Sequence, residues 1–79
     1  MEESKYVDLL IVMCHEQLYV AETTMSTAQV NDLVEFDGMI GHVVDNNMTC
    51  RHGDERYEWV SKFRPISKVT QIWRLTNGS

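Results

Sequence analysis

Hydrophobic and polar residues alternate most clearly within residues 30–45. One apolar run, Leu33–Phe36, ends at Asp37-Gly38, and a second run begins at Met39. An Asp-Gly pair between two alternating runs is a strong hairpin signal, because a tight type I′ turn needs positive φ at both central residues. The pattern therefore predicts a β-hairpin whose turn is Asp37-Gly38.

Residues 6–13 are almost continuously apolar, with Asp8 as the polar exception. Their leucine, isoleucine and valine content favours a strand. A helix capped by Ser4 is the alternative for this segment. With the strand, Cys14-His15-Glu16 becomes a turn into a second strand, Gln17–Glu22.

Further turn signals lie at Asn46-Asn47 and at Gly53-Asp54. Glycine in the first position suits a type II′ turn, so we expect two strands, residues 48–52 and 55–60, to pair across Gly53-Asp54. In that register one face, assigned to the core, carries Met48, Cys50, Tyr57 and Trp59.

The last part of the chain predicts a short helical turn followed by a strand. Ser61-Lys62-Phe63 suits a single helical turn, which ends because Arg64 precedes Pro65 and is pushed toward extended geometry. Apolar alternation then predicts a final strand, with Trp73 assigned to the core, through Val69, Gln71, Trp73 and Leu75. Five to six short strands with tight turns predict an all-β fold, either a small barrel or a strongly bent antiparallel sheet.

Two stretches of the chain resemble SH3-like barrels of bacterial and phage accessory proteins. Residues 31–44 are similar to the "G-D-x-V … G-x-x-G-x-V" opening of such barrels, although Asn31 stands where glycine is usual. Residues 61–66 look like the short helical turn and "L-R-P" before their last strand. The resemblance implies a single domain with an SH3-like core at residues 30–75 and an extra N-terminal hairpin at residues 1–29. It also implies binding of proteins or nucleic acids, and no catalytic residue.

Composition fits one small globular domain. The chain has 79 residues, of which 43% are hydrophobic and 24% are charged. Its first residues are acidic where a secretory signal needs positive charge, so we expect a cytoplasmic protein that does not associate with membranes.

The charge is divided unequally along the chain. Residues 1–49 carry nine acidic residues and one basic residue, whereas residues 50–79 carry six basic and three acidic residues. A nucleic-acid-binding accessory protein is therefore the alternative function, with a face formed by Arg51, Arg56, Lys62 and Arg64. The overall net charge of −5 opposes it, because binding to phosphates is driven by positive charge.

Cysteine and histidine residues do not form a recognisable metal or catalytic motif. Cys14 and His15 are adjacent, and Cys50 and His52 are two residues apart, whereas structural zinc sites use C-x₂₋₄-C or H-x₃₋₅-H spacing. A disulfide is not expected in a reducing cytosol. No base and orienting group can be assigned to either cysteine. We therefore expect no metal, no cofactor and no enzymatic activity.

The chain is expected to act as a non-catalytic interaction or assembly module that binds another protein or itself. Residues 6–13 are apolar on both faces, and a barrel strand has one inner face, so the outer face needs cover. A homodimer through the face carrying Leu10 and Val12 would supply it. The predicted interaction surface comprises Leu10, Val12, Arg51, Arg56, Lys62, Arg64 and Trp73.

Overall fold

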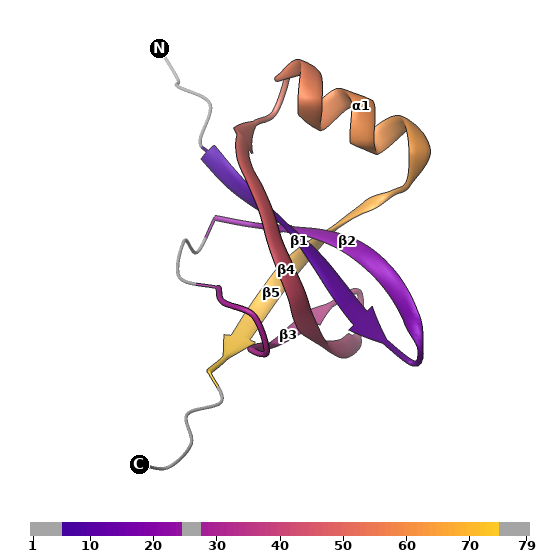
Figure 1. Ribbon diagram of the computed structural model, residues 1–79, viewed down its shortest axis with the longest axis vertical. Helices are drawn as coiled ribbons and strands as arrows, with labels where there is room; N and C mark the ends of the chain where they lie inside the picture. The colour runs from indigo at the N-terminus through magenta and orange to yellow at the C-terminus, as the bar shows by residue number, and fades with distance from the viewer. Residues whose placement is uncertain (1–5, 25–27, 75–79) are drawn as a thin grey trace.

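A computed structural model describes residues 6–24 and 28–74, which form a closed five-stranded barrel and one helix (Figure 1). The strand order around the barrel is β1-β2-β5-β3-β4, with antiparallel pairing except between β2 and β5, which are parallel. The predicted all-β class and the small barrel are confirmed. In chain order the elements are β1 (Tyr6–Cys14), β2 (Gln17–Thr23), β3 (Leu33–Phe36), β4 (Met39–Arg51), α1 (Glu55–Phe63) and β5 (Ile66–Trp73).

The N-terminal hairpin is part of the barrel. Residues 6–13 form a strand, as favoured, and the chain turns into β2 through His15 and Glu16, whose φ angles are 51° and 65°. On its other side β1 pairs with β4 from Tyr6 to Met13. The hairpin therefore supplies two of the five barrel strands described, and residues 30–75 do not close a barrel alone.

The hairpin of β3 and β4 forms as predicted. Asp37 and Gly38 have φ angles of 53° and 77°, as a type I′ turn requires, and Phe36 pairs with Met39 across them.

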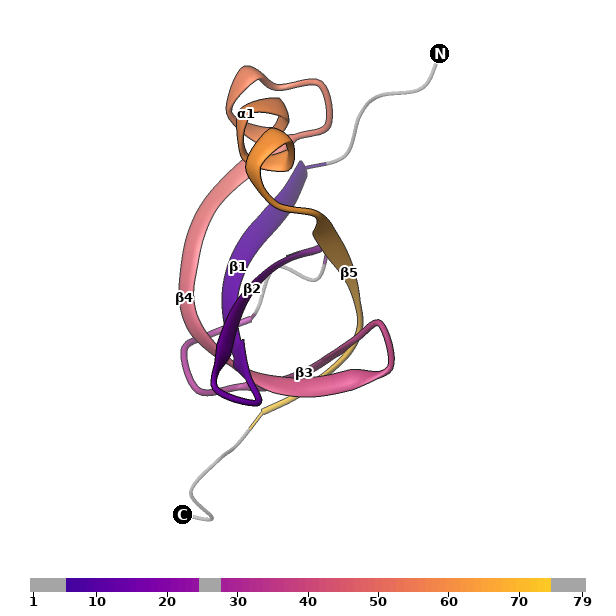
Figure 2. The same cartoon turned by 90° about the vertical axis from the view of Figure 1, so that its right-hand side faces the viewer.

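Asn46-Asn47 is not a turn, and that prediction is wrong. β4 continues through both residues, and its pairing with β1 shifts register at two places. Leu9 and Leu10 face Met48 and Asn46, so Asn47 is an extra residue in β4. Extra residues of this kind bend a strand and increase its twist, and Figure 2 shows β4 curving along the length of the barrel.

Residues 55–63 form a helix, so the predicted hairpin across Gly53-Asp54 is wrong. Gly53 has φ 90°, and Asp54 is the N-cap of α1, its carboxylate accepting a hydrogen bond from the Arg56 backbone N–H at 2.9 Å. The expected turn at residues 61–63 is the last turn of this helix. Its end is as predicted, because Arg64 is extended before Pro65.

Two apolar clusters cover the two faces of β1. The inner cluster, inside the barrel, contains Leu10, Val12, Cys14, Ala21, Ala28, Val34, Phe36 and Val43. The outer cluster lies on the opposite face, where α1 packs over one end of the barrel (Figure 2). It contains Val7, Leu9, Val20 and Cys50, with Ile11, Met48, Tyr57, Val60 and Ile66 packed against them. The helix thus supplies the second layer that the sequence requires for β1.

Candidate functional site

α1 is anchored to the barrel through a buried carboxylate. Glu22 of β2 is 6% exposed and accepts a hydrogen bond from the Tyr57 hydroxyl, while its other oxygen lies 2.8 Å from Nε2 of His52. The His52 and Tyr57 rings also contact each other, with centroids 4.7 Å apart. Burial, and next the hydrogen bond to Glu22, raise the pKa of Tyr57. This cluster holds the N-terminal half of α1 in one position.

Glu22 is a structural residue that sequence reasoning missed. Its signal was available, because β2 alternates and Glu22 shares a face with Val20 and Leu18. An acid in an apolar row needs a partner, and here the partners come from residues 52 and 57.

The opposite side of α1 exposes two large aromatic side chains. Trp59 is 63% exposed and Phe63 is 72% exposed, and their rings meet edge to face with centroids 4.8 Å apart. The assignment of Trp59 to the core is therefore wrong. Tyr57 and Val60 take the core-facing positions on the helix, which leaves Trp59 and Phe63, four residues apart, on another side.

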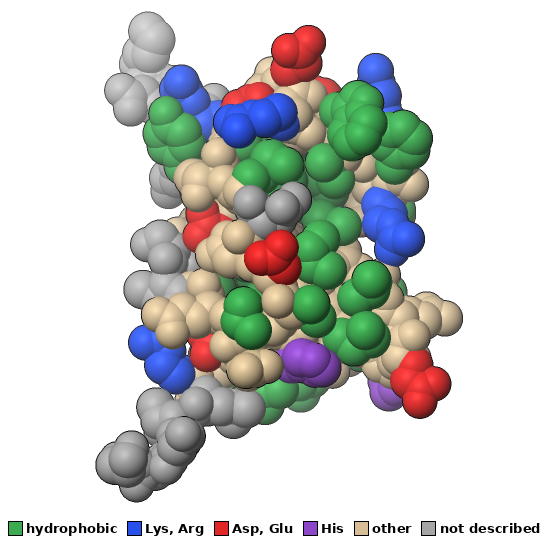
Figure 3. All heavy atoms as spheres, in the orientation of Figure 1, with side chains coloured by type: hydrophobic (Ala, Val, Ile, Leu, Met, Phe, Trp, Pro, Cys, Tyr) green, Lys and Arg blue, Asp and Glu red, His purple; other side chains and the backbone are tan. Residues whose placement is uncertain are grey.

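A mostly apolar groove runs beside these rings. It encloses about 490 Å³ and is lined by Met48 of β4 and by four helix residues, Glu55, Arg56, Trp59 and Val60. Figure 3 shows hydrophobic side chains gathered at α1 and continuing below it over the strands. We call Met48, Trp59, Val60 and Phe63 together the α1 surface.

The strands below α1 continue this apolar face. Leu18 of β2 pairs with Met13 of β1, so the two side chains share the outer face, and Leu18 is 47% exposed. Val44, beside the second irregularity of β4, is 41% exposed. α1 therefore covers only one end of the outer face.

Leu10 and Val12 do not belong to any surface, and their assignment to one is wrong. Both are 0% exposed and belong to the inner cluster. The uncovered part of β1 is the other face, at its C-terminal end, where Ile11 and Met13 are partly buried.

The four basic residues of the predicted face are split between the two ends of α1. Arg51 lies against the Tyr6 ring, and Arg56 forms an ion pair of 3.2 Å with Asp54. The hydrogen bond between Asp54 and Arg56 lowers the pKa of the carboxyl and raises that of the guanidinium. At the other end, Lys62 is exposed and Arg64 donates to the Leu18 carbonyl at 2.6 Å. These bases do not form one continuous face.

Trp73 lies at the far end of β5, and its assignment to the core is wrong. Val69 pairs with Phe36 and Gln71 pairs with Glu35, so Thr70 is an extra residue that reverses the alternation. Ile72 then packs on the inner cluster and Trp73 is 38% exposed. Trp73 is about 23 Å along the strand from Ile66, which adjoins α1. Leu75, the last residue of the expected pattern, lies outside the described residues.

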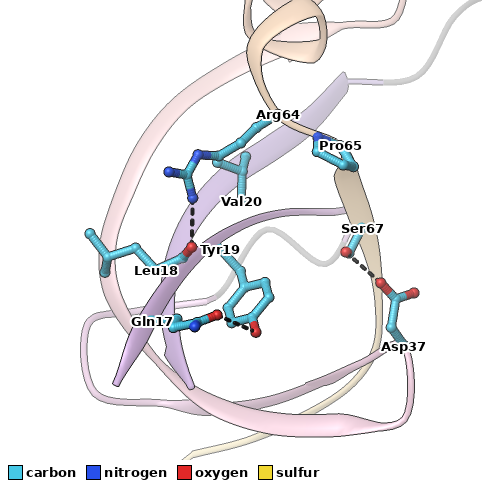
Figure 4. A pocket seen from close by; sticks show the side chains of 8 residues that line it. All are labelled: Gln17, Leu18, Tyr19, Val20, Asp37, Arg64, Pro65 and Ser67. Atoms are coloured by element: carbon cyan, nitrogen blue, oxygen red, sulfur yellow. Dashed lines mark hydrogen bonds between the residues drawn. The ribbon is translucent and has the colours of Figure 1, made fainter. Parts of the chain in front are cut away.

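A second pocket lies between β2 and β5, where Arg64 and Tyr19 face Asp37 (Figure 4). Its polar groups are already paired with each other. Arg64 donates to the Leu18 carbonyl, the Tyr19 hydroxyl donates to Gln17 at 3.2 Å, and the Ser67 hydroxyl donates to Asp37 at 2.6 Å. The pocket thus presents few polar groups to a ligand.

The cysteine and histidine residues singled out in the sequence lie apart. Cys14 is at the C-terminal end of β1, whereas Cys50 pairs with Val7, about 23 Å away along the strand. Among residues 6–24 and 28–74 no three metal-binding side chains cluster. Burial, and next the Asp54 carboxylate, raise the pKa of the Cys50 thiol, which disfavours the reactive thiolate.

Fold and site together define a small β-barrel that carries a helix with an exposed aromatic side. No helix in the described part of the chain is long and apolar enough to cross a membrane. Comparison with protein-family models, curated proteins and solved structures found no match to this chain.

Proposed function

We propose that this protein is a non-catalytic interaction module that binds a protein through the α1 surface. The observation that carries the proposal is the contact between Trp59 and Phe63, two aromatic side chains that are 63% and 72% exposed on one helix. Aromatic side chains are enriched at protein interfaces, and tryptophan is prominent among the residues that dominate binding energy.

The anchoring of α1 supports this function. Glu22 holds Tyr57 and His52, and Arg64 donates to the Leu18 carbonyl. Because these contacts lie at both ends of the helix, the aromatic side chains sit on a fixed support. A surface that is ordered before binding loses less entropy when a partner arrives.

Charge favours a protein partner over the alternative of a nucleic acid. The net charge of −5 repels phosphates, and Arg56 is already paired with Asp54. The remaining bases are divided between the ends of α1 and are accompanied by Glu55 and Glu58 in its first turn. Such a mixture of charges around an apolar centre is the usual anatomy of a protein interface.

Site-specific photo-cross-linking in the cells of origin tests the proposal. A photoreactive phenylalanine analogue replaces Phe63, and in a control it replaces Ile40, which is 54% exposed at the start of β4. We expect discrete protein adducts from position 63, absent from position 40. No adduct at position 63, or adducts only with nucleic acid, would contradict the proposal.

A purified-protein measurement separates the two functions further. The chain should pass through a nucleic-acid column without salt-dependent retention. Retention that weakens steeply with added salt would favour the nucleic-acid alternative, because each neutralised phosphate adds to the salt dependence.

A further inference from the structure

We propose that the partner of the α1 surface is a second copy of this chain, with the two α1 helices packed antiparallel about a two-fold axis. This inference rests on the proposed function and specifies its partner. It also replaces the site that the sequence suggested for self-association, because Leu10 and Val12 are 0% exposed.

One stripe of α1 carries an acid, two aromatic rings and a base in that order. Glu55, Trp59, Lys62 and Phe63 are spaced by four, seven and eight residues from the first, so a period of 3.6 residues places them on one side of the helix. Glu55 and Lys62 stand about 10 Å apart along the helix axis, with Trp59 between them.

The stripe is complementary to itself. A two-fold rotation near Trp59 reverses the helix direction and places Glu55 of one copy opposite Lys62 of the other, twice in each dimer. Both side chains are exposed, and neither makes an ion pair within the described residues. An unrelated partner would not require matched opposite charges at the two ends of one stripe, whereas an isologous pair does.

The exposed area is in the range that a small dimer needs. α1 has no fully buried residue in the single chain, and its two stripe rings are about two-thirds exposed. An aromatic side chain buries roughly 150–250 Å² when it is covered, so four such rings supply about half of the roughly 1,200 Å² at the lower limit of stable interfaces. Met48 and Val60 in the adjoining groove add apolar area on each copy.

Charge reversal tests this arrangement through sedimentation velocity of the purified full chain. From low to several hundred micromolar, the unchanged protein should form dimers. Glu55→Lys alone and Lys62→Glu alone each place like charges together twice, so each should raise the dimer dissociation constant by at least about tenfold. An equimolar mixture of the two variants restores opposite charges at both contacts and should form a heterodimer.

Controls use the same charge changes elsewhere on the surface. Glu16→Lys lies in the β1–β2 turn and Lys68→Glu lies in β5, and both positions are exposed. These variants should associate like the unchanged protein. Phe63→Ser, which removes a ring without changing charge, should abolish the dimer, and far-UV circular dichroism establishes that each variant is folded.

Two results would overturn the inference. One is an unchanged protein that stays monomeric at several hundred micromolar. The other is a mixture of the two charge variants that associates no better than either variant alone. If the protein is monomeric while position 63 still cross-links to other proteins in cells, this inference fails and the proposed function stands.

Discussion

Gly41 occupies the tightest point between β4 and β1, and replacing it with alanine should be severely destabilising. A Cβ atom at this position would lie 2.5 Å from the Met13 carbonyl oxygen, 2.8 Å from Cγ1 of Val12 and 3.0 Å from Cβ of Cys14. Retreat is blocked on the other side, because Gly41 pairs with Val34 of β3. One added methyl group therefore forces two barrel strands apart.

The expected cost is large relative to the stability of so small a domain. Overpacking of a filled interior costs about 1–3 kcal/mol, and here the nearest obstacle is backbone rather than a flexible side chain, so we expect about 3 kcal/mol for Gly41→Ala. A domain of this length has a free energy of unfolding of roughly 4–12 kcal/mol. The melting temperature should fall by more than about 10 °C.

Gly38 is the matched control, because its constraint has a different origin. Nothing lies within 4 Å of a Cβ atom built there, but its φ is 77°. Gly38→Ala should therefore cost about 1–2 kcal/mol from the left-handed backbone alone, and Gly38→Val at least as much. Asparagine tolerates positive φ, so Gly38→Asn should recover part of this loss, whereas Gly41→Asn should be worse than Gly41→Ala.

Urea unfolding followed by far-UV circular dichroism measures all of these variants. Circular dichroism is preferable to fluorescence because Trp59 and Trp73 are both exposed in the folded state. Equal midpoints for Gly41→Ala and the unchanged protein, at equal denaturant dependence, would refute the close approach of β4 and β1. A Gly41→Asn protein more stable than Gly41→Ala would refute the steric origin of the effect.

Three further predictions concern the helix, its anchor and the cysteines. Trp59→Ser combined with Phe63→Ser should change the free energy of unfolding by no more than about 0.5 kcal/mol, whereas Phe36→Ala should cost about 3–5 kcal/mol; similar urea midpoints for the two proteins would contradict this. Because burial and Glu22 raise the pKa of Tyr57, the folded state holds the phenol proton more tightly than the unfolded state does. Stability should be fully present below the ordinary phenol pKa of about 10 and fall as the pH rises above it, and Tyr57→Phe should flatten this dependence in urea midpoints measured against pH. Protein purified without a tag or chelator should contain no stoichiometric metal by elemental analysis, and one zinc per chain would contradict the separation of the two cysteines.

Several local features could be predicted from neighbouring residues alone. The turn at Asp37-Gly38 follows from the backbone freedom of those two residues, and the end of α1 follows from the clash between Pro65 and the residue before it. The apolar row of residues 6–13 predicts a strand covered on both faces. These features depend on interactions within a few residues, so the sequence determines them before the chain folds.

The helix at residues 55–63 depended on tertiary packing. Gly53-Asp54 suits a tight turn or a helix N-cap equally well, and alternation of residues 55–60 suits a strand. The outer face of β1 decides between them, because Val7 and Leu9 need cover and a helix brings Tyr57 and Val60 over them. A strand in this place would instead have turned Trp59 inward with Tyr57.

Extra residues in two strands also lay beyond the reach of sequence patterns. Alternation identifies the buried face only while the pairing register is constant, and Asn47 and Thr70 each shift it by one residue. A register shift is a property of two strands together, so Trp73 could not be placed from its own strand.

What the sequence by itself determined is the all-β class, the hairpin at Asp37-Gly38 and the need for two layers around β1. What only the tertiary structure decided is which segment forms the second layer, and therefore which apolar residues remain exposed. Leu10 and Val12 are buried because the barrel closes over them, and Trp59 and Phe63 are exposed because α1 turns its other side to the outer cluster. Burial depends on every element that packs against a residue, and those elements come from distant parts of the chain.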